Sequence, residues 1–202
     1  DTLYNNLEKA KQTNFYSTLG LTEKEYILLT MHRPSNVDND ALFSHYIHTF
    51  LEISKNDPIV YPVHPRALAK LKELNLYSKL QEQPNFHLIE PIGYIEMLNL
   101  TFNSKVVFTD SGGLQEETTV LGIPCFTLRD NTERPITITE GSNTLVGSNP
   151  DSILDHLNIL NSRPSKTFSC PKFWDGKTSQ RILDDLLKRF TSNSVLKEVQ
   201  TA

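Results

Sequence analysis

The feature that most constrains the fold of this chain is a regular alternation of short apolar runs with longer segments of helical spacing. The apolar runs are rich in β-branched and aromatic residues, and they predict strands at residues 26–31, 58–64, 86–89, 105–109 and 123–128, with a weaker one at 144–146. The intervening segments predict helices at residues 40–54, 67–76, 93–102, 114–121 and 151–160. Strands that alternate with helices form a parallel sheet, and right-handed crossovers place helices on both of its faces. The sequence therefore predicts a doubly wound α/β domain.

Both ends of the chain lie outside this alternation. Residues 1–23 predict a helix and a connector, and residues 179–190 predict an amphipathic helix. A free-standing domain of this class does not need both segments. Just before the last helix, Phe173 and Trp174 are expected to pack as an apolar plug.

Composition excludes several classes of protein. Of the 202 residues, 38% are hydrophobic and 22% are charged, which is typical of a globular chain rather than a disordered one. The net charge of -4 argues against a general polyanion binder such as a nucleic-acid-binding protein, although a single phosphate site stays possible. No apolar run approaches the roughly 18 residues of a membrane helix, and no signal-peptide pattern opens the chain. Cys125 and Cys170 form no metal knuckle or disulfide framework, so we expect a reducing, cytoplasmic location.

Nearly all of the unusual polar residues fall in five loops that follow predicted strands. Ligands of doubly wound sheets bind at the carboxyl ends of the strands, where such loops gather. The clustering therefore predicts one functional site, built from residues 32–39, 64–66, 90–93, 110–113 and 129–134.

The strongest local motif is the segment Thr109-Asp-Ser-Gly-Gly-Leu-Gln-Glu-Glu117, at the junction of a predicted strand and helix. Ser111, Gly112 and Gly113 would place a hydroxyl and open backbone N–H groups at a helix N-terminus, which favours a phosphate. An ordinary helix cap by Asp110 or Ser111, with the two glycines supplying only the turn, is the alternative. The motif is neither a Walker A loop nor a GxGxxG fingerprint. One turn later, Glu116 and Glu117 are either carboxylates for sugar hydroxyls or solvated surface residues.

Histidine and arginine residues follow three of the predicted strands. His32 and Arg33 pair an imidazole with a guanidinium, which suits proton transfer and anion binding. His64 occupies the corresponding place on the next strand, and Arg134 is held extended by the following proline, so that it could reach a ligand phosphate. A structural role for the histidines and simple solvation of the charged loop are the alternatives.

Taken together, these segments resemble the non-hydrolysing UDP-N-acetylglucosamine 2-epimerases, and specifically their C-terminal half. The resemblance spans nearly the whole chain in the same order, through Leu29-Thr-Met-His-Arg33, Tyr61-Pro-Val-His-Pro65, Thr109 to Glu117, Leu121-Gly-Ile-Pro124, Arg129-Asp-Asn-Thr-Glu-Arg-Pro135, and Asp175-Gly176 with Arg181-Ile182. This family has the GT-B architecture, in which two Rossmann-like domains enclose the substrate. The resemblance implies that residues 1–23 are an interdomain connector and residues 24–178 a Rossmann-like UDP-binding domain. Residues 179–202 would form a C-terminal helix that packs toward a missing N-terminal domain.

The resemblance also implies a mechanism, the interconversion of UDP-GlcNAc and UDP-ManNAc by elimination and re-addition of UDP. By position, His32 matches a catalytic histidine, and His64 matches a residue of a second, activating UDP-GlcNAc site. Glu117 would take the ribose hydroxyls. The other residues matching substrate-binding positions are Arg33, Met97, Ser111, Gly112, Gly113, Glu116 and Arg134. No metal or nicotinamide cofactor is implied, and the expected partners are UDP-GlcNAc or UDP, the missing domain and, at full length, a second copy.

Some features depart from the family pattern. Pro34-Ser35-Asn36 follows the His-Arg pair where Arg-Glu-Asn is commoner, and Asn131 replaces the usual threonine. The carboxylates proposed to move the C2 proton belong to the first domain, so the isolated chain is expected to be inactive. Three alternatives stay open: a GT-B glycosyltransferase domain, a hydrolysing 2-epimerase, and a non-catalytic UDP-binding module.

Overall fold

A six-stranded, wholly parallel sheet forms the centre of the molecule, with strand order β3-β2-β1-β4-β5-β6. The computed structural model describes residues 1–162 and 168–200, and of residues 192–200 it describes only the helical backbone. The strands are β1 (Ile27–Thr30), β2 (Ile59–Pro62), β3 (Phe86–Ile89), β4 (Val106–Thr109), β5 (Cys125–Thr127) and β6 (Asn143–Leu145). All six lie within or next to the predicted runs, and the predicted doubly wound α/β class is confirmed.

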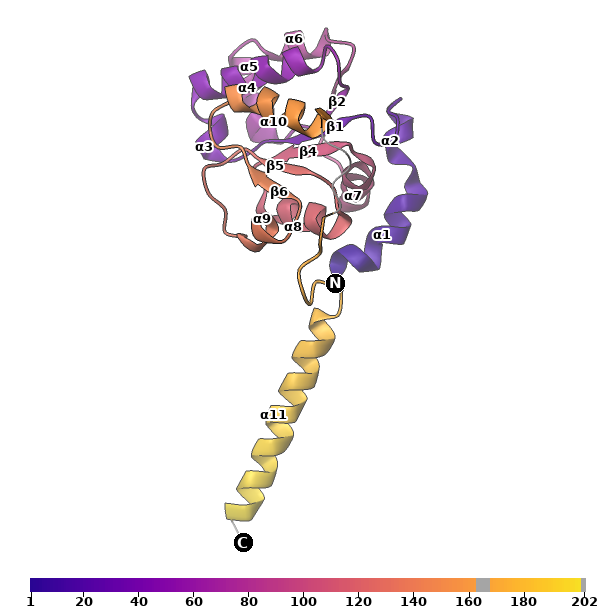
Figure 1. The fold of residues 1–202 in the computed structure, drawn as a ribbon, viewed down its shortest axis with the longest axis vertical. Helices are drawn as coiled ribbons and strands as arrows, with labels where there is room; N and C mark the ends of the chain where they lie inside the picture. Colours follow the sequence, from indigo (N-terminus) through magenta and orange to yellow (C-terminus); the bar gives the residue numbers. More distant parts are fainter. Residues whose placement is uncertain (163–167, 201–202) are drawn as a thin grey trace.

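Two layers of helices cover the sheet (Figure 1). One face carries α4 (Asp40–Ile53), α5 (Pro65–Glu73), α6 (Tyr77–Gln81) and α10 (Asp151–Ser162), and the other carries α7 (Tyr94–Asn103) and α8 (Gly112–Leu121). Side chains alternate between the faces, as a pleated strand requires. Ile27 and Leu29 pack in the first layer with α4, whereas Leu28 packs in the second layer with Leu100 of α7.

The N-terminal segment packs along the second layer. It contains α1 (Thr2–Thr13) and α2 (Phe15–Thr18), and Leu3 and Ala10 of α1 are buried against Leu98 of α7. The buried side chain of Asn99 joins α7 to α1 and α2, because its Nδ2 donates to the carbonyl of Ala10 (2.9 Å) and its Oδ1 accepts from the N–H of Tyr16 (3.0 Å). Residues 1–18 are therefore fixed to the sheet domain.

Short helical turns account for the main local differences from the sequence-based expectations. The loop at residues 32–39 contains the single turn α3 (Pro34–Val37), because Pro34 occupies the first helical position, where its missing N–H costs no hydrogen bond. The turns α6 and α9 (Ile136–Thr139) were not predicted either. Such short pieces lack the repeated apolar spacing by which a helix is recognised in sequence.

The last helix, α11 (Thr178–Gln200), projects from the body as a rod (Figure 1). Its start is held by Asp1, whose carboxylate accepts from the N–H groups of Thr178 (2.9 Å) and Ser179 (2.7 Å). The predicted helix at 179–190 is confirmed, and its apolar residues are exposed: Ile182, Leu183, Leu186, Leu187 and Phe190. The expectation for residues 179–202 extends past the described residues at its end. Among the described residues, no helix is both long and apolar enough to cross a membrane.

The segment before α11 does not form the expected apolar plug. The side chain of Phe173 is 60% exposed and lies between two cations, with Lys172 and Arg181 each about 5 Å from its ring. Only Trp174 is partly covered, and its carbonyl accepts from the hydroxyl of Tyr4 (3.0 Å). The expectation is wrong for Phe173.

Candidate functional site

The candidate site lies where the strand order of the sheet reverses. The chain runs from β1 to β2 on one side and later continues from β4, on the other side of β1, to β5. At such a point the loops after the two central strands diverge and leave a crevice at the carboxyl edge of the sheet. His32 and Arg33 follow β1, and Asp110 and Ser111 follow β4. For these two loops, the predicted gathering at the carboxyl ends of the strands is confirmed.

Asp110 organises this crevice. Its side chain is completely buried, and its Oδ2 accepts from the N–H groups of His32 (2.9 Å) and Arg33 (2.8 Å) and from Nδ2 of Asn36 (3.2 Å). Nδ1 of His32 lies 3.0 Å from its Oδ1. Burial alone would raise the pKa of Asp110, but the donors from His32 and Arg33 outweigh burial and hold the pKa below its usual value. A stable carboxylate therefore fixes the loop after β1. The sequence indicated Asp110 only as a possible helix cap.

The buried carboxylate of Asp110 shifts the pKa of His32 above its usual value. The hydrogen bond to Asp110 raises the pKa of the imidazole, and burial opposes this increase only in part. Its side chain is 40% exposed, so part of the imidazole is accessible to a ligand. When protonated, an imidazole positioned in this way can donate a proton or stabilise an anion.

His64 lies beside His32, with the two ring centroids 5.4 Å apart. It is the N-cap of α5, and its Nδ1 accepts from the N–H of Arg66 at 3.2 Å. The structure thus gives His64 a capping role and also brings it next to the candidate catalytic histidine.

Three arginines and two glutamates form the charged rim of the crevice. Nε of Arg33 donates to the carbonyl of Asp110 (3.2 Å), and its Nη1 lies 3.8 Å from Glu133. Arg129 binds both carboxylate oxygens of Glu133 and lowers the pKa of that group to about 2. Nε of Arg134 lies 2.8 Å from Glu116, and both side chains are partly exposed. Arg33 and Arg134 are therefore held at the rim by pairs that an anionic ligand can compete with.

The N-terminus of α8 is open. Ser111 is the N-cap residue, but its side chain makes no capping hydrogen bond, which disfavours the simple cap interpretation. A Cβ atom at Gly112 would meet nothing within 4 Å, and one at Gly113 would meet only Oγ of Ser111 at 3.8 Å. The packing of the protein itself does not require these glycines. They leave space and free N–H groups at the positive end of a ten-residue helix.

Glu117 lies one turn further along α8, beside a cavity of about 620 Å³ between the starts of α1 and α11. Burial raises the pKa of Glu117, and the hydroxyl of Tyr94 opposes this by interacting with the carboxylate. Burial and the same carboxylate raise the pKa of Tyr94 to about 12. Glu116 lines the same cavity, whereas Met97 packs on α7 against the apolar cluster of the second layer.

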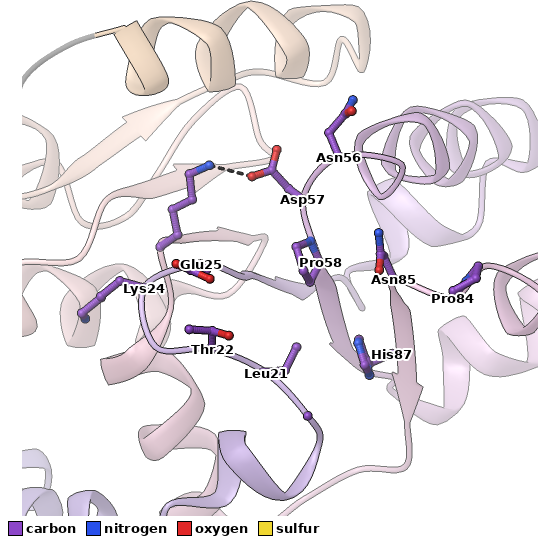
Figure 2. Close-up of a pocket in the computed structure, with 12 residues that line it drawn as sticks. Leu21, Thr22, Lys24, Glu25, Asn56, Asp57, Pro58, Pro84, Asn85 and His87 are labelled. Atoms are coloured by element: carbon purple, nitrogen blue, oxygen red, sulfur yellow. Dashed lines mark hydrogen bonds and ion pairs between the residues drawn. The ribbon is translucent and has the colours of Figure 1, made fainter.

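A second cavity, of about 540 Å³, lies at the opposite edge of the sheet (Figure 2). It is lined by the connections that precede β1, β2 and β3, with His87 in its wall and an ion pair between Lys105 and Asp57 (2.6 Å). None of the predicted site residues lines it. Among the described residues, no cluster of three His, Cys, Asp or Glu side chains could hold a metal ion.

Sequence comparison identifies one family over most of the chain. The family model described as UDP-N-acetylglucosamine 2-epimerase matches residues 1–187. The UDP-N-acetylglucosamine 2-epimerase of Methanocaldococcus jannaschii is 38% identical over 178 residues, which are 87% of this chain and 48% of that protein. A Methanococcus maripaludis protein of the same name is 44% identical over 176 residues, covering 86% of this chain and 47% of that protein. The UDP-2,3-diacetamido-2,3-dideoxy-D-glucuronate 2-epimerase of Pseudomonas aeruginosa is 40% identical over 174 residues, covering 85% and 47%.

Solved structures give the same result. The UDP-GlcNAc 2-epimerase of M. jannaschii in complex with UDP-GlcNAc and UDP superposes with a TM-score of 0.81 at 37% identity, covering 92% of this chain and 52% of that one. The enzyme of Neisseria meningitidis bound to UDP-GlcNAc superposes with a TM-score of 0.78 at 30% identity, over 92% and 52% of the two chains. This chain therefore spans about half the length of the relatives that it matches.

Proposed function

This chain belongs to the UDP-N-acetylglucosamine 2-epimerase family, and from that premise we propose that it is the C-terminal, UDP-binding half of a two-domain GT-B epimerase. The whole protein would interconvert UDP-GlcNAc and UDP-ManNAc. The observation that carries this proposal is the open N-terminus of α8 beside His32, which a buried carboxylate holds in place and whose pKa that carboxylate raises. Such a site suits a diphosphate that leaves and returns.

The ends of the chain support the two-domain arrangement. In this proposal residues 24–178 are the UDP-binding domain and residues 1–23 are the connector. The C-terminal helix, residues 179–202, would pack toward the first domain. The starts of α1 and α11 are joined through Asp1, so in this proposal both helices would begin beside the first domain at one place. The exposed apolar face of α11 is of the kind that a partner surface normally covers.

The proposed chemistry at this half of the site is stabilisation of the departing UDP. When the bond between C1 of the sugar and the β-phosphate breaks, negative charge grows on the phosphate oxygens. The N–H groups of Gly112 and Gly113 and the hydroxyl of Ser111 would hold the diphosphate at the positive end of α8. Arg33 and Arg134 would approach from the rim. His32 would donate a hydrogen bond or its proton to the β-phosphate and take it back when UDP re-adds.

Glu117 would bind the ribose. A carboxylate can accept hydrogen bonds from two adjacent hydroxyl groups, and Glu117 lies one turn below the proposed phosphate site. Met97 lies in the stretch of α7 that would meet the uracil, and His64 would belong to a second, activating nucleotide-sugar site next to His32. The residues that move the C2 proton would come from the first domain.

A second candidate is 2-epimerisation of a modified UDP-sugar. The P. aeruginosa relative is named for a diacetamido glucuronate, and its 40% identity is similar to that of the archaeal relatives named for UDP-GlcNAc. The two candidates share the diphosphate and ribose sites and differ only in the sugar. In either case we propose that the full-length protein is cytoplasmic and forms a homodimer. Light scattering is the direct test of the dimer.

Calorimetric titration of this chain with UDP tests the binding half of the proposal. We expect UDP to bind, and we expect Ser111→Ala and Glu117→Ala each to weaken binding about tenfold or more, because each removes hydrogen bonds to or from a charged group. Asn85→Ala, in the cavity of Figure 2, is the matched control and should leave the affinity unchanged. Absence of UDP binding by both this chain and the full-length protein would contradict the proposal.

Product analysis of the full-length protein in D₂O tests the chemical half. An epimerase yields both UDP-sugars with deuterium at C2, whereas this chain alone should yield none. Free ManNAc with UDP would instead indicate a hydrolysing enzyme, and transfer of the sugar to an acceptor would indicate a glycosyltransferase. Binding without any turnover at full length would indicate a UDP-binding module. Offering the diacetamido glucuronate substrate in parallel decides between the two sugars.

A further inference from the structure

A buried polar network lies under the loop that carries Arg134. Its centre is Gln115 on α8, whose side chain is fully buried. Oε1 of Gln115 accepts from the hydroxyl of Thr132 (2.5 Å) and from Nδ2 of Asn143 (3.2 Å). The same Nδ2 lies 3.1 Å from Oγ1 of Thr137. The network therefore ties α8 to the segment that follows β5 and to the first residue of β6.

The network holds the backbone of Arg134 on both sides. The N–H of Arg134 donates to Oγ1 of Thr132 (2.9 Å), and its carbonyl accepts from the hydroxyl of Thr137 (2.7 Å). Two threonines that bond to the buried amides thus fix both polar backbone groups of one exposed arginine. The position of its Cα atom relative to α8 is set by buried contacts.

The side chain of Arg134 is held much more weakly than its backbone. Its Nε pairs with Glu116, the neighbour of Gln115 on α8, but the two side chains are 47% and 40% exposed. Exposed pairs of this kind contribute little and exchange readily. The loop thus combines a rigid base with a guanidinium that can leave Glu116 for a stronger anion.

Nε2 of Gln115 is buried and has no hydrogen-bond partner within the part of the chain that the structure describes. An amide left half satisfied costs folding free energy, and an apolar side chain of similar size would avoid that cost. The need for stability alone therefore does not explain glutamine here. What glutamine provides here is the acceptor oxygen Oε1, which binds the hydroxyl of Thr132.

We propose that Gln115 and Thr132 are positioning residues that hold Arg134 at the N-terminus of α8, ready to meet the terminal phosphate of a nucleoside diphosphate. This inference rests on the proposed function, because it takes the diphosphate to bind at Ser111–Gly113. An arginine whose backbone is already fixed loses less conformational freedom when it binds a phosphate. The contribution of these residues is thus confined to the phosphate part of the ligand.

The test compares a ligand that has the diphosphate with one that lacks it. UDP is titrated by calorimetry and uridine by NMR chemical shifts, with Thr132→Val, Thr132→Ala, Thr132→Ser and Arg134→Ala. Thr132→Val and Thr132→Ala should weaken UDP about tenfold and leave uridine within about twofold, since the lost interaction is one charge-assisted contact to phosphate. Thr132→Ser keeps the hydroxyl and should restore UDP binding. Thr132→Val combined with Arg134→Ala should be no worse than Arg134→Ala alone, because both remove the same contact.

Thr139→Val is the matched control, because Thr139 ends α9 in the same segment and its hydroxyl contacts the carbonyl of Pro135 at 3.5 Å rather than the backbone of Arg134. It should change neither affinity. A purely structural role for Thr132 predicts instead a lower melting temperature with an unchanged ratio of UDP to uridine affinity. That result, with UDP still bound by the wild type, would overturn this inference alone. Failure of the wild-type protein to bind UDP would overturn the proposed function with it.

Discussion

The two edges of the sheet use polar residues in different ways. At the carboxyl edge, donors from the loop after β1 and from α3 converge on the buried carboxylate of Asp110, across 74 to 78 residues of chain. At the amino edge, the cavity of Figure 2 is lined by mostly exposed polar side chains such as Thr22 and Asn85. Its main tertiary ion pair joins Lys105 to Asp57, both of which keep some contact with water. At the amino edge, therefore, the polar residues belong to hydrated loops that connect helices to strands. At the carboxyl edge they hold specific groups in fixed positions.

The largest difference between the edges should appear when each loses its central aspartate. Asp110→Ala removes a completely buried carboxylate that accepts from two backbone N–H groups and pairs with His32. We expect a loss of about 3–5 kcal/mol in the free energy of unfolding, as for other broken buried ionic groups. Asp57→Ala, at the amino edge, should cost only about 1–2 kcal/mol, because its ion pair is partly hydrated. Urea denaturation of both variants measures the difference, and equal losses would contradict the comparison.

The pH dependence of stability should have opposite signs at the two edges. The folded-state pKa of His32 is raised by Asp110, so the folded protein binds more protons there than the unfolded chain does. This stabilisation is complete below about pH 6.5 and is lost as the pH rises through the folded-state pKa. Burial lowers the pKa of His87, at the amino edge, so its effect on stability is lost as the pH falls below about 6.5.

Urea denaturation from about pH 5 to about pH 8.5 separates the two histidines. His32→Gln should flatten the decline of stability toward high pH, and His87→Gln should flatten the decline toward low pH. If both variants changed the same side of the profile, the proposed difference between the edges would be wrong. The single variant His48→Gln, at an exposed position on α4, serves as the control.

The smallest effect should come from an exposed pair at the carboxyl edge. Glu116→Ala breaks the contact with Arg134, but both groups are partly exposed, so stability should change by less than about 0.5 kcal/mol. The variant shows whether burial, rather than the choice of edge, sets the cost of losing a charge. Thermal denaturation with a loss above about 1 kcal/mol would show that this pair is more tightly held than its exposure indicates.

Periodicity was enough to predict the strands, the main helices and the edge at which the unusual residues gather, because these follow from short-range spacing and from parallel strand direction. It could not predict the role of Asp110. That role depends on residues of another loop covering the carboxylate, which only the packed structure specifies. The same holds for Gln115, whose partners Thr132 and Asn143 lie 17 and 28 residues away. The expectation for Phe173 was wrong because an aromatic side chain can also lie between surface cations, as this one does between Lys172 and Arg181.

The position of β1 between β2 and β4 also determines when the site can form during synthesis. Strand β1 pairs with β2 after only α3 and α4 intervene, whereas its pairing with β4 joins residues as far apart as Thr30 and Thr109, separated by 79 positions. Long-range parallel pairing is slow, because the entropy of closing the loop is lost before any contact forms. A nascent chain that has emerged only as far as β3 therefore exposes one side of β1 and lacks the carboxylate that orders the following loop. The crevice is thus assembled late. Until β4 is added, β1 keeps an unpaired edge of the kind that chaperones would recognise.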